Sequence, residues 1–174
     1  KSLIDEMQGT ITIESEEGVG SVFTITLPFE IAAEQPQTEQ PAPAKAKDIS
    51  GLHLLLVEDN ALNAEIAAAL LADRGVSVEL PRDCSEAVRM FREAPAGTYA
   101  GIIMDIMMPV MDGLTATRAI RALERADAKT IPIIAMSANA YAEDVQKCLD
   151  TGMNAHISKP LYKDVMLETI ERFV

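Results

Sequence analysis

The pattern of apolar and polar residues predicts two kinds of structure in this chain, one before residue 30 and another after residue 50. Residues 10–14 and 22–27 alternate between apolar and polar side chains, and Gly18 and Gly20 lie between them. Alternation with a period of two residues around a glycine turn is typical of a β-hairpin. We therefore predict an N-terminal hairpin.

After residue 50, apolar runs typical of strands alternate with stretches that have helical spacing. The predicted strands are residues 53–57, 76–80, 100–104, 131–136 and 155–158. The residues predicted to mark helix faces are Ala87, Val88 and Phe91, then Val145, Cys148 and Leu149, and then Met166, Ile170 and Phe173. Because parallel strands are joined by right-handed helical crossovers, the pattern predicts an α/β fold, a doubly wound five-stranded parallel sheet with five helices.

The segment between these two patterns has the composition of a linker. Residues 30–50 contain three Pro, three Gln, three Glu and five Ala, with only two large aliphatic residues. Such a segment is semi-extended and cannot bury a core. The sequence thus predicts a fragment at residues 1–29, a linker at 30–50 and a folded domain at 51–174.

Composition narrows the range of functions. A formal net charge of -12, from 15 basic and 27 acidic residues, disfavours binding to nucleic acid or to an anionic membrane surface. The two cysteines, Cys84 and Cys148, lie outside any CxxC pattern and are predicted to be buried and reduced. We find no apolar run of about 18 residues and no signal-peptide pattern, so we expect a cytoplasmic location with no direct membrane contact from this chain.

Reactive side chains follow four of the five predicted strands. In an open parallel sheet, such groups gather beyond the carboxyl ends of the strands. The residues at these positions are Glu58, Asp59, Asp105, Ser137, Lys159 and Pro160. Carboxylates a few ångströms apart repel by about 4 kcal/mol per pair at an effective dielectric constant near 20, so this arrangement requires either protonation or a cation, and a hard divalent ion is the natural answer. Mg2+ prefers oxygen ligands and keeps several waters, which leaves one carboxylate available as a nucleophile.

Residues 52–174 resemble the receiver domain of two-component response regulators, in the form found in hybrid histidine kinases. Four stretches carry the resemblance: LLLVEDNALN, IIMDIMMPVMDG, IPIIAMSANA and GMNAHISKPL. The resemblance implies a flavodoxin-like strand order, 2-1-3-4-5. It also implies that Asp105 accepts a phosphoryl group, and that Glu58, Asp59, Asp105 and the backbone carbonyl of Met107 bind Mg2+.

The resemblance assigns roles to the remaining site residues. It makes Ser137 the switch hydroxyl, Lys159 the phosphate-pairing lysine, and Pro160 the residue after a cis peptide bond. Receivers usually have Tyr or Phe where this chain has His156, so His156 is either a modified, pH-sensitive part of the switch or a tolerated variant. Asn139 lies where side chains modulate the access of water to the phosphoryl group.

Several acidic and sulfur-containing residues near this site have ordinary structural interpretations. We interpret Asp112 and Gly113 as a turn and helix cap rather than as ligands. The methionines Met104, Met107, Met108 and Met111 are interpreted as loop and packing residues, because thioethers suit soft ions rather than a site of hard oxygen ligands. We expect His53 to lie on the strand surface without a chemical role.

Residues 1–29 resemble the C-terminal end of the ATP-binding domain of sensor histidine kinases. In that family the Asn-bearing helix and the glycine-rich lid come earlier in the chain, so this fragment is not expected to bind ATP. The resemblance implies a relay. The dimerisation domain of a histidine kinase would donate a phosphoryl group from phosphohistidine, and a histidine phosphotransfer protein would accept it.

Two other functions are considered. A pseudo-receiver would regulate the kinase as an interaction module without phosphorylation, but such domains tend to lack the acceptor Asp or the Lys, and both are present here. A metal-dependent phosphatase with an Asp nucleophile would carry a second Asp two residues after the first, where this chain has Met107. The sequence favours the phosphorelay receiver.

Overall fold

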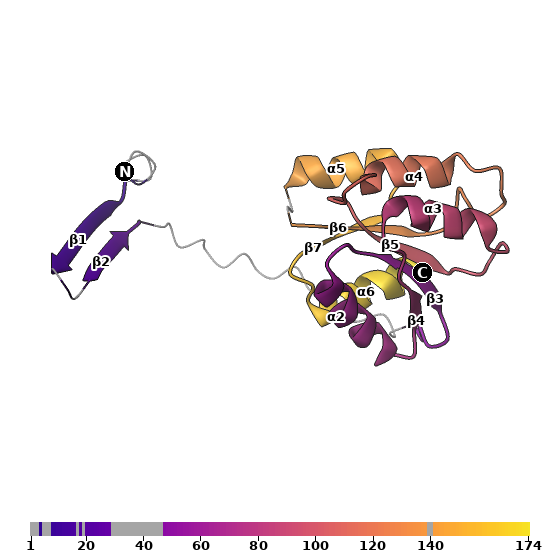
Figure 1. The fold of residues 1–174 in the computed structure, drawn as a ribbon, viewed down its shortest axis with the longest axis horizontal. Helices are drawn as coiled ribbons and strands as arrows, with labels where there is room; N and C mark the ends of the chain where they lie inside the picture. The colour runs from indigo at the N-terminus through magenta and orange to yellow at the C-terminus, as the bar shows by residue number, and fades with distance from the viewer. Residues whose placement is uncertain (1–3, 5–7, 17, 19, 29–46, 139–140) are drawn as a thin grey trace, which may run out of the picture. The chain divides into compact units, whose positions relative to one another are not determined.

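The computed structural model describes residues 4, 8–16, 18, 20–28, 47–138 and 141–174 (Figure 1). The chain divides into two units, Lys1–Ala44 and Lys45–Val174, and each is described by itself. In the part of the chain that is described, we find no helix that is both long and apolar enough to cross a bilayer. Asn139 lies outside the described residues.

The first unit contains the predicted hairpin. Strand β1 (Thr10–Glu16) pairs in antiparallel register with β2 (Gly20–Thr26), and Ile13 lies opposite Phe23. The alternation places the side chains of Ile11, Ile13, Phe23 and Ile25 on one side of the hairpin, and all but Ile11 are exposed in this unit. The hairpin therefore presents an apolar side that finds no cover within the described residues of its own unit.

The second unit is a five-stranded parallel sheet with helices on both faces, as the sequence predicted. Its strands are β3 (His53–Val57), β4 (Ser77–Glu79), β5 (Gly101–Asp105), β6 (Ile133–Ser137) and β7 (Ala155–Ser158). Its helices are α2 (Ala61–Ala72), α3 (Cys84–Glu93), α4 (Gly113–Arg121), α5 (Ala142–Thr151) and α6 (Lys163–Phe173). The strand order β4-β3-β5-β6-β7 confirms the predicted order 2-1-3-4-5.

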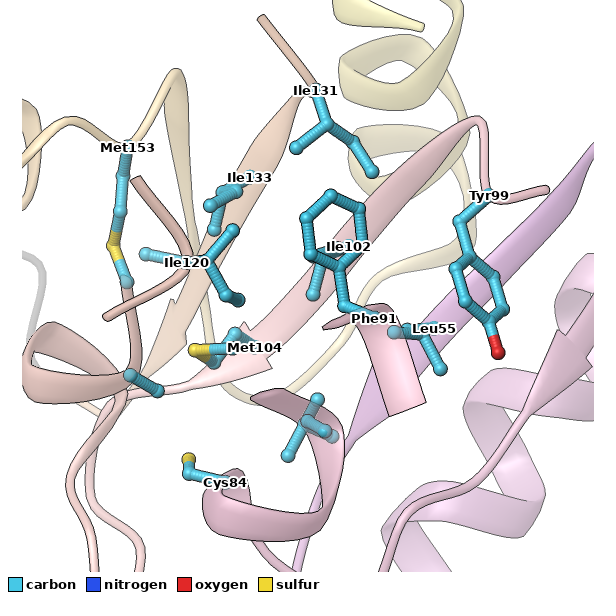
Figure 2. Packing of buried hydrophobic residues seen from close by; sticks show 14 of the residues in the cluster. Leu55, Cys84, Phe91, Tyr99, Ile102, Met104, Ile120, Ile131, Ile133 and Met153 are labelled. Atoms are coloured by element: carbon cyan, nitrogen blue, oxygen red, sulfur yellow. The ribbon is translucent and has the colours of Figure 1, made fainter. Parts of the chain in front are cut away.

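Two apolar clusters cover the two faces of this sheet. Helices α3, α4 and α5 lie on one face, and α2 and α6 lie on the other (Figure 1). Residues that alternate along each strand separate to the two sides, so Leu55 and Ile102 belong to one cluster while Leu54 and Ile103 belong to the other. Figure 2 shows the first cluster, in which Phe91 lies beside Ile102 of β5 and Ile131, which precedes β6. The cysteines, Cys84 and Cys148, are both buried, as predicted.

Some details of the second unit differ from the sequence prediction. The edge strand β4 has three residues instead of five, and each of these three residues pairs with β3. Leu149 has the helical spacing predicted for it with Val145 and Cys148, but Leu149 is 42% exposed while Cys148 is buried. It borders a cavity of about 460 Å³ between α5, β7 and α6. Ile49, inside the predicted linker, is buried in the cluster beneath α2 and α6, so packing of this unit begins before residue 51.

Candidate functional site

Three carboxylates meet at the carboxyl edge of the parallel sheet. Glu58 and Asp59 follow β3, and Asp105 is the last residue of β5, the neighbouring strand. One carboxylate oxygen from each residue lies within 4.8 Å of the others. Glu58 and Asp105 are buried, whereas Asp59 is exposed, so the cluster opens to solvent on one side. Such a group of hard oxygen donors suits a small divalent cation.

Lys159 brings a positive charge into this cluster from β7, on the far side of β6. Its Nζ lies 2.7 Å from Oδ2 of Asp105 and 2.5 Å from Oε2 of Glu58. Burial opposes the charged form of Lys159, but the contacts with Asp105 and Glu58 outweigh this effect and raise the pKa of Lys159 above its usual value. The backbone N–H of Lys159 donates to the carbonyl of Ser137, which fixes the start of the loop. The Lys159–Pro160 peptide bond is cis.

The carboxylate of Glu58 is held by the beginning of α2. Asn60 caps this helix by accepting hydrogen bonds from the backbone N–H groups of Leu62 and Asn63. The side-chain amide of Asn63 in turn donates to Oε1 of Glu58 at 3.2 Å. The other oxygen of Glu58, Oε2, is buried and accepts from the ammonium of Lys159, whose Nζ lies 2.5 Å away. A metal ion that binds this oxygen would therefore compete with the ammonium of Lys159.

Asp105 is positioned by the loop that follows it. Its Oδ1 accepts a hydrogen bond from the backbone N–H of Met107 at 3.0 Å. The loop closes where the N–H of Gly113 donates to the carbonyl of Ile106 at 3.0 Å. A Cβ at Gly113 would lie 2.4 Å from the carbonyl oxygen of Asp105, so only glycine allows α4 to begin this close to β5. Asp112 caps α4, in agreement with the sequence interpretation.

Ser137, the last residue of β6, is buried at the same edge of the sheet. Its hydroxyl lies 2.8 Å from Nε2 of His156. The resemblance to receivers assigned both residues to the switch, and the structure shows that their side chains are in contact. Ser137 also borders a cavity of about 270 Å³ that Met107 and Cys148 help to line. Burial is the main cause that raises the pKa of the Cys148 thiol, so this thiol lines the cavity in its uncharged form.

Sequence reasoning did not identify Asn63, assigned Gly113 only to a turn and helix cap, and did not expect a polar cluster around His53. Asn63 donates a hydrogen bond to Glu58, and Gly113 packs closely against the backbone of Asp105. The spacing of residues in the sequence does not reveal either contact. His53, expected to have no chemical role, contacts Glu79 at 3.0 Å and stacks on Tyr99 with ring centroids 5.3 Å apart. His53 is the first residue of β3, whereas Glu58 and Asp59 follow the other end of that strand.

Comparison with known proteins gives relatives of the same architecture. The chain is 34% identical over 170 residues to the sensor protein EvgS of Escherichia coli O157:H7, an alignment that covers 95% of this chain and 13% of that protein. The chain thus spans a small part of this relative's length.

Two solved structures resemble the second unit. One is the receiver domain of a sensor histidine kinase from Pseudomonas aeruginosa PAO1 with a magnesium ion coordinated in its active-site cleft. It is 39% identical, with a TM-score of 0.63, over 71% of this chain and 98% of that one. The other is the receiver domain of Ssk1 from Saccharomyces cerevisiae, crystallised with the histidine phosphotransfer protein Ypd1. It is 27% identical, with a TM-score of 0.62, over 70% of this chain and 88% of that one.

The family match covers most of the second unit. Residues 54–171 match the response regulator receiver domain, a stretch that includes the three carboxylates, Ser137 and Lys159. Fold and acidic site agree with this match, as does the similarity to receiver regions of sensor histidine kinases. The chain therefore belongs to the response regulator receiver domain family, and its acidic site lies in a phosphorelay signalling domain.

Proposed function

We propose that the second unit accepts a phosphoryl group from phosphohistidine onto Asp105 in a reaction that requires Mg2+, and passes it to a histidine phosphotransfer protein. The observation that carries this proposal is the convergence of three carboxylates on one lysine. Nζ of Lys159 contacts both Glu58 and Asp105, and Asp59 completes the acidic cluster. An acceptor carboxylate needs this kind of compensation before an anionic phosphoryl group can approach.

The residues present fit a magnesium ion. Three carboxylates and one ammonium leave a formal charge of -2, which one divalent cation neutralises. The buried Oε2 of Glu58 would be a ligand atom, in competition with the ammonium of Lys159. Glu58, Asp59, Asp105 and the carbonyl of Met107 would hold the ion. Mg2+, when bound, neutralises these carboxylates and coordinates a phosphoryl oxygen.

The chain's own residues account for the rest of the transfer. A carboxylate oxygen of Asp105 forms a bond to phosphorus while the phosphorus–nitrogen bond of phosphohistidine breaks, and the departing imidazole nitrogen takes up a proton from water. Lys159 moves from the carboxylates to a phosphoryl oxygen, and the Ser137 hydroxyl donates a hydrogen bond to another. Because Ser137 contacts His156, this movement reaches the face formed by α5, β7 and α6. His156 is therefore the second member of the switch.

The proposed partners are proteins that carry a reactive histidine. The donor is the dimerisation domain of a histidine kinase, and the acceptor is a histidine phosphotransfer protein. The complex of Ypd1 with the Ssk1 receiver supports the second assignment, because that receiver has the fold described here. Leu62 and Ile66 on α2 are exposed next to the acidic cluster and offer an apolar surface to such a partner.

We also propose that residues 1–29 are the C-terminal fragment of a histidine kinase ATP-binding domain, joined by the linker at 30–50 to the receiver at 51–174. The alignment with EvgS covers 95% of the chain and so extends beyond the receiver, and the chain divides into the units Lys1–Ala44 and Lys45–Val174. The apolar side of the hairpin supports this proposal, since Ile13 and Phe23 would pack inside a larger sheet domain.

Labelling with a small phosphodonor tests the proposed function. The full chain is incubated with radiolabelled acetyl phosphate with Mg2+ or with EDTA, and a base-labile phosphate on Asp105 is expected only with Mg2+. Asp105→Asn should abolish this label. Asp150→Asn, a change of the same kind at an exposed position of α5, should leave it unchanged. A base-labile label that persists in Asp105→Asn would contradict the assignment, and a folded wild type that takes no label would favour the pseudo-receiver.

A further inference from the structure

The carboxylate of Glu58 is held by two different kinds of donor, one kind on each oxygen. Oε2 accepts from the ammonium of Lys159, whose Nζ lies 2.5 Å away. Oε1 accepts from two neutral donors, the side-chain amide of Asn63 at 3.2 Å and the backbone N–H of Asn60 at 3.4 Å. The Glu58 side chain is 1% exposed, so these donors, rather than bulk solvent, set its orientation.

Asn63 is the stronger of the two neutral donors and is itself fixed in place. Its hydrogen bond to Glu58 is the shorter, and the 3.4 Å contact of Asn60 is near the limit for a hydrogen bond. The backbone N–H of Asn63 donates to the side chain of Asn60, so the first turn of α2 holds the residue. Asn63 also borders a cavity of about 150 Å³ together with Lys159. The amide is thus oriented toward Glu58 by the fold.

The two side-chain donors differ in how they respond when charge arrives at the site. The proposed transfer requires Lys159 to leave the carboxylates for a phosphoryl oxygen, and a divalent cation would compete with it for Oε2 of Glu58. Asn63 is uncharged and bonds the opposite oxygen, so neither event displaces it. If both donors were lost, the Glu58 side chain would regain freedom of rotation, and metal binding would have to order it again.

We propose that Asn63 is a positioning residue for the magnesium site, which keeps Glu58 oriented toward the ion once Lys159 has left it. This inference rests on the proposed function. Asn63 acts through Glu58, because its hydrogen bond lowers the entropy that this side chain loses when it binds a cation. Removing a residue that orients a metal ligand in this way typically lowers metal affinity by about ten- to a hundredfold.

Asn63→Leu removes the amide donor and keeps the backbone N–H that donates to Asn60. Leucine is a good helix former, so α2 should still form and the Tm should stay within about 3 °C of the wild type. Because Lys159 still orders Glu58 in the free protein, affinity for Mg2+ should fall by only about threefold. In the Lys159→Met protein, Asn63 is the side-chain donor that remains on Glu58 among the described residues. There the same change should lower the affinity by about tenfold.

Calorimetric titration of the full chain with Mg2+ measures four affinities, those of the wild type, Asn63→Leu, Lys159→Met and the double variant. Acetyl phosphate labelling over a range of Mg2+ concentrations is the second readout. The Mg2+ concentration for half-maximal labelling should rise about threefold in Asn63→Leu, while the maximal rate stays at the wild-type value because saturating Mg2+ orders Glu58. Gln146→Leu, which removes an amide from the exposed side of α5, is the matched control and should change neither quantity.

Other outcomes separate the inference from the proposed function. If removal of the amide changes Mg2+ affinity in neither background, the inference is overturned and the function stands. An equal loss in both backgrounds would overturn it too, because Asn63 would then act independently of Lys159. A lower maximal rate of labelling in Asn63→Leu at saturating Mg2+ would point to a disturbed Asp105 and would also overturn it. A wild type that binds Mg2+ but takes no label would instead contradict the proposed function, and the four affinities would still decide the inference.

Discussion

Nζ of Lys159 lies 2.7 Å from Oδ2 of Asp105, although the two residues are 54 positions apart in the chain. The same ammonium group is 2.5 Å from Oε2 of Glu58. Lys159 therefore occupies the two buried carboxylates that a metal ion would use. Its positive charge stabilises the acidic cluster, but it also competes with any cation that binds there.

Lys159→Met should separate metal binding from phosphoryl transfer. Removing the ammonium leaves three carboxylates with no lysine between them, so affinity for Mg2+ should rise by at least about tenfold. Labelling of Asp105 by acetyl phosphate should fall by about a hundredfold or more, because the phosphoryl group loses its partner. Calorimetric titration with Mg2+ and radiolabelling measure the two effects. Lys163→Met is the matched control, since Lys163 pairs with Asp73 on the surface and should change neither. An unchanged Mg2+ affinity in Lys159→Met would show that the lysine does not compete for the carboxylates.

Gly113→Ala should disturb the end of β5. The added Cβ would meet the Asp105 carbonyl at 2.4 Å, so α4 and β5 must separate. We expect a loss of about 1–3 kcal/mol in the free energy of unfolding, measured by urea denaturation, together with slower labelling of Asp105.

The control for this change is Ala119→Gly, within α4 and away from β5. It should lower stability by about 1 kcal/mol through helix propensity and leave labelling intact. A Gly113→Ala protein that is labelled at the wild-type rate would argue against a role for the close approach in positioning Asp105.

A double-mutant cycle tests the contact between Ser137 and His156. The two side chains are 2.8 Å apart, so Ser137→Ala and His156→Phe each remove the same hydrogen bond. Their effects on the free energy of unfolding should differ from additivity by about 1 kcal/mol. Ser137→Ala combined with Thr151→Ala, at the far end of α5, should be additive. Additive effects in the first pair would mean that the hydrogen bond does not couple the two residues.

Tyr99 gives a prediction at alkaline pH. Its hydroxyl donates to Oε2 of Glu79 at 2.8 Å, and burial together with Glu79 raises the pKa of Tyr99 to about 12. In the unfolded chain a tyrosine ionises near pH 10, so the unfolded state loses its proton first. The stability from this group is complete below about pH 10 and is lost as the pH rises from 10 towards 12. The loss should reach about 1 kcal/mol by pH 11.

Urea denaturation between pH 8 and 11 measures this loss. Tyr99→Phe should remove this part of the pH dependence. Tyr141→Phe, at a residue that is 71% exposed, should retain it. Equal pH profiles for the wild type and Tyr99→Phe would contradict the role of the buried hydroxyl.

The architecture of the second unit follows from its sequence because each strand has a clear apolar run. Strands β3 and β7 have the predicted bounds, and β5, buried along its whole length, was predicted as a central strand. Once the strands are parallel, their carboxyl ends lie at one edge, which places Glu58, Asp59 and Asp105 near each other without knowledge of any contact.

The features that the sequence did not reveal depend on how a helix is rotated about its axis and on individual hydrogen bonds. Val145, Cys148 and Leu149 have the spacing of one helix face, but α5 turns Cys148 to the core and leaves Leu149 beside a cavity. The hydrogen bond from Asn63 to Glu58 depends on a helix cap. The left-handed φ of Val110 could not be predicted from the sequence either, because valine favours extended backbone with a negative φ.

Because the core is separated into two clusters, the two sides of the domain can evolve independently. Leu54 and Leu55 are neighbours in the chain but pack with different helices on opposite faces. A volume change on the side of α2 and α6 can be compensated by another change on that side, without repacking the side of α3, α4 and α5. Each face is thus free to diversify on its own while the shared sheet keeps the acidic edge constant.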